Sequence, residues 1–537
     1  MKRIWGIVIL CAVVMEAAAI PARPGWRTYT QPDGSSIDVQ IIGDEFYHYT
    51  VNRDGQRIEM NQEGWYEVVG NEPTPDEFAA LRTQSKKMRS PRKTLGVTPN
   101  LAPRGIVIMI NFADKSFLPA HTQAVVDSLC NAEDCKVNKI GNVHFPSAGQ
   151  YFLDQSNGKY HPIFDVYGPV TLSHNMAYYG ANDRQGNDLR VGVAVVEACK
   201  MVEGIADFTQ YDSDHDGKVD FVYVMYAGES ENATGIPSQI WPHSYSIDEE
   251  FEYRDPYFLE VYPTRADCMV DGKQINTYAC SSELDDDELD GIGTLCHEFS
   301  HVLGLSDFYD TNYSTNYTNK LTPNEWDVMD AGSYNGKGHC PPNYSAWEKF
   351  FFGWHNPINL GDKGRTLELK ANGTDGYQAY QLNAIGAQYT ATTPGLCYYF
   401  ENRQKTGWDR FLPAAGLVIW RVDYDELRWK NNTPNNTAND PHYTVVCSNG
   451  TKVGSSNGRG NVFPYSTSSK TIDSWEEVAS KPLKNIRQSG GIVTLDYIRA
   501  GKPALKLMDK GTIVIIRNGL MYDISGRLIG QVENENN

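Results

Sequence analysis

The chain has 537 residues, of which 40% are hydrophobic and 21% charged, and its formal net charge at pH 7 is −19. These values are typical of a folded protein with several domains, and they exclude a disordered or collagen-like chain. The negative charge disfavours nucleic acid and anionic membrane surfaces as partners. We expect a monomer that binds no nucleic acid.

The first residues predict a secretory signal peptide. Lys2 and Arg3 precede the apolar run Ile4–Val14, and Ala17–Ala19 supply the small side chains of a cleavage site. The run is too short to span a bilayer, and no later segment reads as a transmembrane helix. We expect removal of residues 1–19 and secretion of the protein, with association with the cell surface or outer membrane left open.

Short alternating segments separated by turns follow, and then the basic, polar stretch Leu81–Gly96. Alternation with a period of two residues predicts a small unit of β-hairpins. An exposed polar stretch is a frequent site of proteolytic cleavage. Residues 20–96 are therefore predicted to be a β-rich propeptide with its processing linker, and a plain interdomain linker is the alternative.

Residues 97–355 are predicted to form an α/β domain. The apolar runs Arg104–Asp114 and Val219–Gly228 suit buried strands, whereas Thr122–Cys130 and Asp188–Val202 have helical periodicity. Strands that alternate with helices are typical of α/β domains.

The pattern changes after this domain. Residues 356–500 contain short strands separated by turns, with no clear amphipathic helix, and they predict an all-β, sandwich-like domain. Residues 501–537 alternate on both sides of Arg517-Asn518-Gly519 and predict a terminal hairpin, which is a candidate sorting tail.

Nine of the ten cysteines lie outside the predicted signal peptide. The spacings of Cys130 and Cys135, and of Cys268 and Cys280, suit local disulfides in an oxidising compartment. Cys296 is predicted to be a buried free thiol on the apolar side of a helix.

The segment GTLCHEFSHVLGLSDFYD carries the main chemical signal. On a helix, His297 and His301 lie one turn apart on one face, where their imidazoles can bind one zinc ion. Glu298 stands where the HExxH motif has its general base. Gly304 allows a left-handed turn at the helix end, and three residues later Asp307 supplies a third protein ligand.

Three more residues bear on this predicted site. Met329, in NEWDVMDAGSYNG, is the candidate for the methionine turn of a metzincin-like site. Tyr334 is a weaker candidate for an oxyanion contact. Glu283 is the alternative third ligand, and a helix that spells the motif without binding metal is the alternative to the whole site.

The stretch YDSDHDGKVDF predicts a calcium loop. Asp212, Asp214 and Asp216 alternate before a glycine, so their carboxylates can converge on one hard cation. The carbonyl of Lys218 and the carboxylate of Asp220 complete the predicted ligand set. A tyrosine replaces the bidentate glutamate of an EF-hand and a strand follows, so the loop is not part of an EF-hand; a solvated acidic turn is the alternative.

These segments resemble the immune-inhibitor-A-like family of secreted bacterial metalloproteases. The resemblance covers about residues 104–425 and includes GQYFLDQSNGKYHPIFDVYGPVTL, DFTQYDSDHDGKVDFVYVMYAG, IWPHSY, GTLCHEFSHVLGLSDFYD, WDVMDAGSYNG, YSAWEKFFFGW and YYFENRQKTGWDRFLPAAGLVIWRVDY. It implies a metzincin-like zinc endopeptidase that is made as a zymogen and binds calcium. It also implies zinc ligands at His297, His301 and Asp307 and a general base at Glu298. Ser300 departs from the family, which often has glycine there.

We therefore predict a secreted zinc endopeptidase that hydrolyses peptide bonds of proteins. Two other functions stay open, namely a surface-binding or adhesive protein with structural metals and an exopeptidase that acts on short peptides. Glu298 argues against the first, because a structural metal site has no use for a general base. The sequence offers no evident clamp for a peptide terminus in support of the second.

Overall fold

The computed structural model describes most of the chain between Ala18 and Gln531. The described residues are 18–44, 47–61, 63–74, 76–78, 80–81, 104–182, 187–248, 264, 266–311, 322–384, 386, 388–437, 440–448, 462–464, 471–472, 481–497, 505–509, 512–517, 520–523 and 527–531. The predicted signal peptide up to residue 17 and the basic stretch 82–96 lie outside them. None of the helices in these ranges combines the length and the apolar character needed to cross a membrane.

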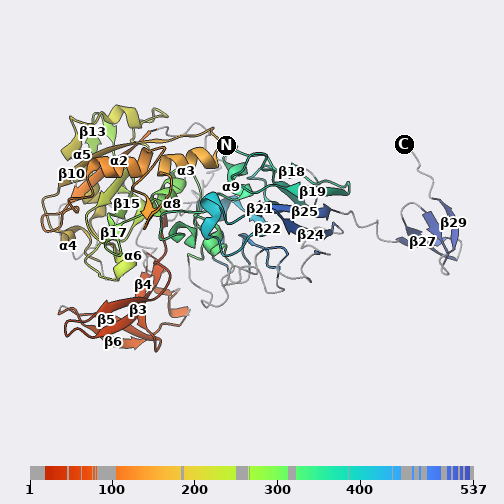
Figure 1. Ribbon diagram of the computed structural model, residues 1–537, viewed down its shortest axis with the longest axis horizontal. Coiled ribbons are helices and arrows are strands. Elements are labelled where there is room, and N and C mark those ends of the chain that lie inside the picture. Colours follow the sequence, from red (N-terminus) through yellow and green to blue (C-terminus); the bar gives the residue numbers. More distant parts are fainter. Residues whose placement is uncertain are drawn as a thin grey trace, which may run out of the picture.

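The N-terminal unit is an antiparallel sheet of five strands in sequence order, drawn in red in Figure 1. Its strands are β2 (Arg27–Thr30), β3 (Ser36–Asp44), β4 (Tyr47–Asn52), β5 (Gln56–Met60) and β6 (Tyr66–Asn71). The small clusters that it buries are far smaller than the cores of the rest of the molecule. The predicted β-hairpins are present, and the unit has little core of its own.

A six-stranded mixed sheet forms the centre of the next unit. In spatial order its strands are β1 (Ala18–Ala19), β12 (His243–Ser246), β15 (Thr277–Ser282), β11 (Val222–Tyr226), β7 (Arg104–Asn111) and β10 (Ile163–Thr171). Strands β15, β11, β7 and β10 are parallel to one another. At one edge of the sheet, β12 runs antiparallel to β15, and β1 runs antiparallel to β12. The N-terminus of the described chain thus pairs with a strand more than 200 residues away.

Helices cover both faces of this sheet, which explains its continuous apolar strands. Val107 and Met109 of β7 face one core, together with the helices α2 (Gln123–Asn131), α3 (Ala148–Gln155) and α8 (Gly293–Val302). Ile106 and Ile108 face the opposite core with α5 (Val191–Val202). The α/β interpretation is confirmed, and the predicted strands and helices are present with slightly shorter bounds.

Shorter elements connect these layers. They are α4 (Met176–Tyr179), α6 (Glu231–Thr234), α9 (Ala346–Phe351), α10 (Glu426–Lys430), β8 (Lys139–Ile140), β9 (Val143–His144), β13 (Met269–Val270), β14 (Lys273–Gln274), β16 (Leu284–Asp285) and β17 (Glu288–Leu289), and the 3₁₀ turns η1 (Phe208–Tyr211), η3 (Asn324–Trp326), η4 (Ala331–Tyr334) and η5 (Gly407–Phe411). Helix α10 is a correction to the sequence analysis, which expected no clear helix after residue 356. Its five residues are too few for periodicity to detect.

Two sheets form the part after residue 356. One contains β18 (Ile358–Asn359), β20 (Tyr380–Asn383), β21 (Gly395–Arg403), β22 (Gly416–Tyr424) and β23 (Tyr443–Val445), and the other β19 (Arg365–Leu369), β25 (Ile492–Tyr497) and β24 (Leu483–Ser489). Residues from both sheets, such as Phe400 and Leu495, share one hydrophobic core.

A larger core crosses the predicted domain boundary at residue 356. The same cluster of buried residues includes Phe299 of α8, Trp347 of α9, Trp420 of β22 and Tyr443 of β23. Figure 1 shows α9 and β22 next to each other in the middle of the molecule, with α8 toward the central sheet. Helix α8 and the downstream sheet therefore contribute side chains to one hydrophobic core.

The remaining strands form a small sheet near the C-terminus. They are β26 (Leu505–Asp509), β27 (Thr512–Arg517), β28 (Leu520–Tyr522) and β29 (Leu528–Gln531). Strands β27 and β28 pair on either side of the predicted turn.

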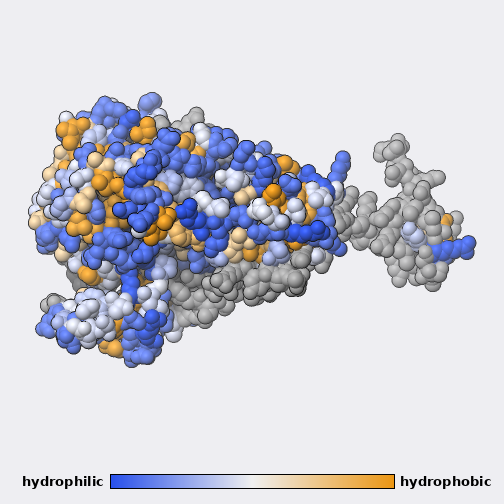
Figure 2. Space-filling model, viewed as in Figure 1, coloured by the Kyte–Doolittle hydropathy of each residue, from blue (hydrophilic) through white to orange (hydrophobic). Residues whose placement is uncertain are grey.

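The face of the molecule in Figure 2 is mostly hydrophilic, with hydrophobic residues scattered singly or in small groups.

The disulfide predictions are wrong. Among the described residues, Cys130, Cys135, Cys268 and Cys280 form no disulfide, and all four are buried. The thiol of Cys268 donates to the carbonyl of Thr264, whereas that of Cys280 donates to the carbonyl of Trp241. The spacing of cysteines in the sequence does not predict which way their side chains point in the folded protein. Cys296 is a buried free thiol, as predicted.

Candidate metal centre

Helix α8 carries His297, Glu298 and His301, all of which are buried. The helix ends in a Schellman motif, in which the N–H of Gly304 donates to the His301 carbonyl and that of Leu305 to the Ser300 carbonyl. Gly304 has a φ of +104°, a conformation that side-chain-bearing residues avoid. The motif reverses the chain, which then leads to Asp307.

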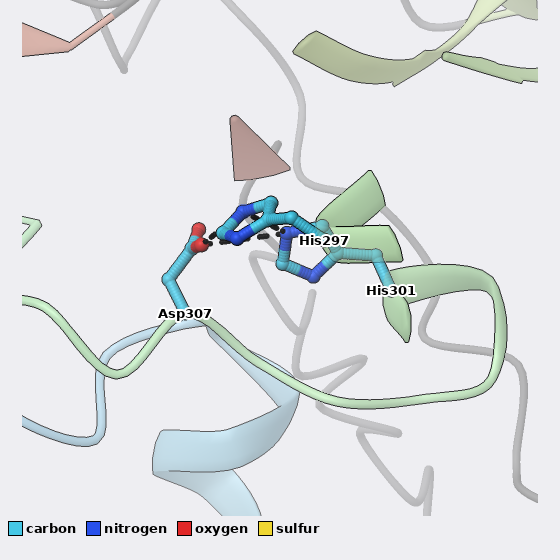
Figure 3. A group of neighbouring side chains, drawn as sticks. All are labelled: His297, His301 and Asp307. Carbon is cyan, nitrogen blue, oxygen red and sulfur yellow. Dashed lines mark hydrogen bonds and ion pairs between the residues drawn. The ribbon is translucent and has the colours of Figure 1, made fainter. Parts of the chain in front are cut away.

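Three ligand atoms meet beyond the helix end (Figure 3). The Nε2 atoms of His297 and His301 are 3.2 Å apart, and Oδ1 of Asp307 lies 3.2 Å and 3.3 Å from them. Tetrahedral zinc with bonds of about 2.0–2.1 Å separates its ligand atoms by about 3.3–3.4 Å. The triangle therefore has the size that a zinc ion requires.

Backbone carbonyls orient both imidazoles. Nδ1 of His297 lies 2.8 Å from the Val328 carbonyl, and Nδ1 of His301 lies 2.9 Å from the Leu305 carbonyl. A proton on each Nδ1 satisfies these carbonyls and leaves both Nε2 lone pairs facing Asp307. Three acceptor atoms then converge, an arrangement that a cation or an added proton stabilises. Two nitrogens and one oxygen suit zinc better than calcium or magnesium.

The electrostatics agree with a site for positive charge. Burial lowers the pKa of His297, but its hydrogen bond to Asp307 and the charges of Glu298 and Asp307 outweigh burial and raise it to about 9. Burial raises the pKa of Asp307, but the two histidines hold it well below its usual range. Without a metal, the carboxylate thus stabilises a proton on the histidines.

The predicted methionine turn passes the first histidine. The Val328 carbonyl accepts from His297, and the next residue, Met329, is fully buried. The Met329 carbonyl also accepts from the N–H of Phe308, one residue after Asp307. The turn therefore touches the segments that carry the first and third predicted ligands.

Tyr334 lies on the other side of the site. Its hydroxyl accepts from Nδ2 of Asn232 at 2.9 Å and donates to the carbonyl of Pro21. Burial, and to a smaller extent the charge of Glu298, raise the pKa of Tyr334 above its usual value, so the hydroxyl stays protonated. The partly buried hydroxyl of Tyr334 thus already donates to one peptide carbonyl of the chain itself, that of Pro21.

The N-terminal segment lies across the same region. Ala18 and Ala19 pair with β12, and β1 also contacts α8; Figure 3 shows its reddish arrow close to the imidazoles. Ile20 is fully buried, and its carbonyl accepts from Nε1 of Trp241. Arg23 then forms ion pairs with Asp285 and Asp286 on the β16–β17 hairpin. The sequence analysis did not foresee this contact.

Glu283 does not join the metal triad. Its carboxylate accepts from the backbone N–H groups of Leu118 and Gly228, and it lies 2.6 Å from Nδ1 of His121. The carboxylate therefore ties two loops together. Among the described histidines, His243 is likewise bound elsewhere, between the Trp241 carbonyl and the Tyr278 hydroxyl.

The acidic loop brings three of its predicted ligands together. Carboxylate oxygens of Asp212, Asp214 and Asp216 lie within 4.8 Å of one another. Oδ1 of Asp212 is buried without a hydrogen bond, whereas Oδ2 is bound by Nζ of Lys273 at 2.6 Å. A calcium ion would satisfy the buried oxygen, so the group fits a hard cation.

The carboxylate group of the acidic loop does not include the other two predicted calcium ligands, Lys218 and Asp220. Asp220 is outside the group, because its Oδ2 accepts from the N–H and hydroxyl of Ser213. Lys218 forms an isolated bridge with Gln274 next to the loop.

Sequence reasoning missed Asn432, which contacts a predicted metal ligand. Its Nδ2 donates to Oδ2 of Asp307, and its Oδ1 accepts from the Asp307 N–H, both at 2.6 Å. The two residues are 125 positions apart, so no local pattern links them.

Comparison with known proteins finds one family that matches the central part of the chain. Residues 108–357 match the family described as "Immune inhibitor A peptidase M6, catalytic domain". Immune inhibitor A of Bacillus thuringiensis subsp. alesti is 27% identical over 226 residues, which cover 38% of this chain and 31% of that protein. Pre-pro-metalloprotease PrtV of Vibrio cholerae serotype O1 is 29% identical over 231 residues, which cover 39% of this chain and 24% of that protein.

The alignments therefore span about a third or less of these curated relatives. The matched region contains the histidine helix, Asp307 and Met329, whereas Asn432 lies beyond it. The chain therefore contains a domain that matches the catalytic domain of the immune inhibitor A peptidases, and its curated relatives over this region include a metalloprotease.

Proposed function

We propose that this protein is a secreted zinc-dependent endopeptidase, made as a zymogen and stabilised by calcium. One observation carries the proposal, namely the triangle of His297, His301 and Asp307 with the buried Glu298 beside it. Zinc bound there would polarise a peptide carbonyl and make a water molecule more acidic. We infer protein substrates from this chemistry and from the family.

Glu298 is the proposed general base and acid. It follows His297 on α8, so its carboxylate lies beside the triangle, shielded from bulk water. An oxygen of the carboxylate takes a proton from the attacking water and then delivers it to the nitrogen of the leaving amine. Burial keeps the proton from exchanging with solvent between these two steps.

Tyr334 is proposed to stabilise the carbonyl oxygen of the substrate as it gains negative charge. Its hydroxyl already donates to a peptide carbonyl, that of Pro21. Asn232 donates to the same hydroxyl oxygen and so orients the Tyr334 proton toward the carbonyl. A preoriented donor in a buried site contributes more than the same donor in water.

The edge strand β12 is proposed to bind the substrate backbone. It pairs with β15 on one side and with the N-terminal β1 on the other. An extended peptide that replaced β1 would add to the sheet as a new strand. The same edge cannot hold both segments. Removal of residues 1–19 with the predicted signal peptide would take β1 away and leave this edge of β12 free for a substrate strand.

Further contacts hold the N-terminal unit, which we propose to be a propeptide ending near residue 96. Arg27 reinforces the ion pairs of Arg23 with Asp285, and His48 binds Glu231 at 3.0 Å. The V. cholerae relative is named a pre-pro-metalloprotease. Cleavage in the basic stretch 82–96 would allow this unit to leave.

The other parts of the proposal rest on the sequence patterns. The leader-like residues 1–19 support secretion, and Asp212, Asp214 and Asp216 support a stabilising calcium ion. The two-sheet unit within residues 356–500 is proposed as a sandwich-like domain, and the terminal strands as a sorting tail.

Replacing Glu298 with glutamine tests the proposal. Loss of the general base should slow cleavage of casein by about 10²–10⁴-fold. Zinc content should not change, because Glu298 is not one of the three ligands. Glu288→Gln is a matched control, since Glu288 is exposed on the β17 hairpin and should leave both properties unaltered.

Two results would contradict the mechanism. One is casein cleavage by Glu298→Gln at the rate of the unchanged protein. The other is cleavage that survives removal of zinc by a chelator. An exopeptidase would release single residues or short end fragments, whereas we expect internal fragments on mass spectrometry.

A further inference from the structure

The loop that carries Asp307 is bound mainly by residues from beyond the family match. The hydroxyl of Ser306 donates to the Trp429 carbonyl at 2.7 Å, and Nδ2 of Asn435 donates to the Phe308 carbonyl at 2.6 Å. The matched region ends at residue 357. The part of the chain after β22 thus contacts the residues on either side of the third ligand.

Aromatic packing strengthens this attachment. Phe308 stacks on Tyr443, with ring centroids 3.8 Å apart and an angle of 18° between the planes. The hydroxyl of Tyr443 donates to Oδ2 of Asp327, which lies two residues before Met329. The same downstream tyrosine therefore contacts both the ligand loop and the methionine turn.

Asn432 contacts the ligand itself. Its amide forms two hydrogen bonds of 2.6 Å with Asp307, one to the backbone N–H and one to Oδ2. The N–H of Asp307 can only donate, so it must face the Asn432 oxygen, and the NH₂ group must then face the carboxylate. This fixed pair leaves Oδ1 directed toward the two histidines.

The backbone at Asn432 is adapted to this role. Its φ is +52°, in the left-handed region that asparagine tolerates better than most residues. The residue follows α10, whose other end is capped by Asp425. The short unpredicted helix and the left-handed turn after it together deliver one amide to the metal ligand.

We propose that Asn432 is a positioning residue for the third metal ligand. The contacts of Trp429, Asn435 and Tyr443 with the same loop complete the support of the metal centre. Asn432 restricts rotation of the Asp307 carboxylate, and its N–H group compensates the charge on Oδ2. This inference rests on the metal-binding part of the proposed function. It assigns to the downstream part of the chain a role in zinc binding that acts through the Asp307 carboxylate.

The test is the zinc affinity of the full chain, measured by competition with a chromogenic chelator. A Glu298→Gln background prevents self-cleavage during the measurement. Asn432→Asp keeps the acceptor for the Asp307 N–H but places a second carboxylate against Oδ2. Asn432→Gly keeps the left-handed backbone and removes both hydrogen bonds. Each variant should bind zinc about 10–100-fold more weakly.

Asn436→Asp is the matched control. Asn436 belongs to the same segment and binds Thr311 through its amide, but it does not contact Asp307. The control introduces the same charge four residues further along the chain and should leave zinc affinity unaltered. Cobalt absorption spectra of the substituted proteins give a second readout, because a displaced carboxylate changes the geometry around the ion.

The outcomes separate the two proposals. If neither the unchanged chain nor any variant binds zinc, the proposed function fails. If the unchanged chain and both Asn432 variants bind zinc equally tightly, Asn432 has only a structural role and this inference is wrong. Should Asn432→Gly fail to fold, as judged by near-ultraviolet circular dichroism, the isosteric Asn432→Asp decides the question.

Discussion

At the residue scale, the metal site depends on the hydrogen bonds that orient the two imidazole rings. Each histidine is oriented by a carbonyl, one at Val328 and the other at Leu305. Leu305 takes its place through the Schellman motif, which requires the positive φ of Gly304. One glycine therefore determines both the tautomer of His301 and the path of the chain toward Asp307.

Gly304→Ala should reduce the free energy of unfolding of the metal-free protein by about 1–2 kcal/mol, because an L-residue is strained at this φ. It should also weaken zinc binding, since the loop after it carries a ligand. Urea denaturation and chelator competition measure the two effects.

Gly272 supplies the control for this prediction. It has a φ of +74° in the β13–β14 turn, where an added Cβ atom would meet only open space. Gly272→Ala should cost stability without changing zinc affinity. Equal zinc affinities for both variants would show that the Gly304 turn does not position the ligand.

At the scale of elements, the predicted calcium loop lies between η1 and β11. Lys273 of β14 neutralises Asp212 when no ion is present. Saturating calcium should raise the free energy of unfolding, by about 2.7 kcal/mol at a concentration one hundred times the dissociation constant. Thermal denaturation with and without a calcium chelator measures the increase.

Asp212→Asn should abolish the calcium-dependent increase, because Asp212 contributes the buried carboxylate. Asp134→Asn, at an exposed position, should retain it. Persistence of the full increase in Asp212→Asn would exclude calcium from this loop.

The attachment of β4 to the catalytic unit should depend on pH. His48 stacks on Trp241 and binds Glu231. Burial lowers the pKa of His48, but the charge of Glu231 and hydrogen bonds to Glu231 and the Asp44 carbonyl raise it above its usual value of 6.5. The ion pair therefore contributes fully below about pH 6.5, and its contribution is lost as pH rises through the raised pKa.

Hydrogen exchange of the N-terminal sheet should therefore become faster relative to the central sheet as pH rises through this range, after correction for intrinsic rates. His48→Gln should remove this pH dependence. His144→Gln, at an exposed histidine of β9, should preserve it. The same slope in His48→Gln and the unchanged protein would assign the dependence to another group.

At the scale of the whole molecule, the units on both sides of residue 356 share a core. Phe299 and Trp420 belong to one buried cluster, and Asn432 binds Asp307 across the same contact. We expect one cooperative calorimetric transition for the central and downstream units together. The measured enthalpy should equal the van't Hoff enthalpy for this transition.

Two resolved transitions would contradict that expectation and would support the independent domains drawn from sequence. Trp420→Ala removes a fully buried side chain from the shared core and should lower the midpoint of the whole transition. Val143→Ala, at an exposed position of β9, is the control and should leave the midpoint unaltered.

Much of the central fold could be predicted because its signals are local. Apolar runs predicted β7 and β11, and helical periodicity predicted α2 and α5. By contrast, β1 is two residues long and exists only through its pairing with β12. Helix α10 has only five residues, so its capping and its packing, and not its composition, stabilise it.

The sequence by itself determined the metal triad, because His297, His301, Gly304 and Asp307 lie within eleven residues and helix geometry converts their spacing into proximity. Tertiary structure alone decided what surrounds the triad. Tyr334 meets a carbonyl 313 positions away, and Asp307 meets an amide 125 positions away. Such contacts form when distant segments pack together, and no local sequence pattern predicts them.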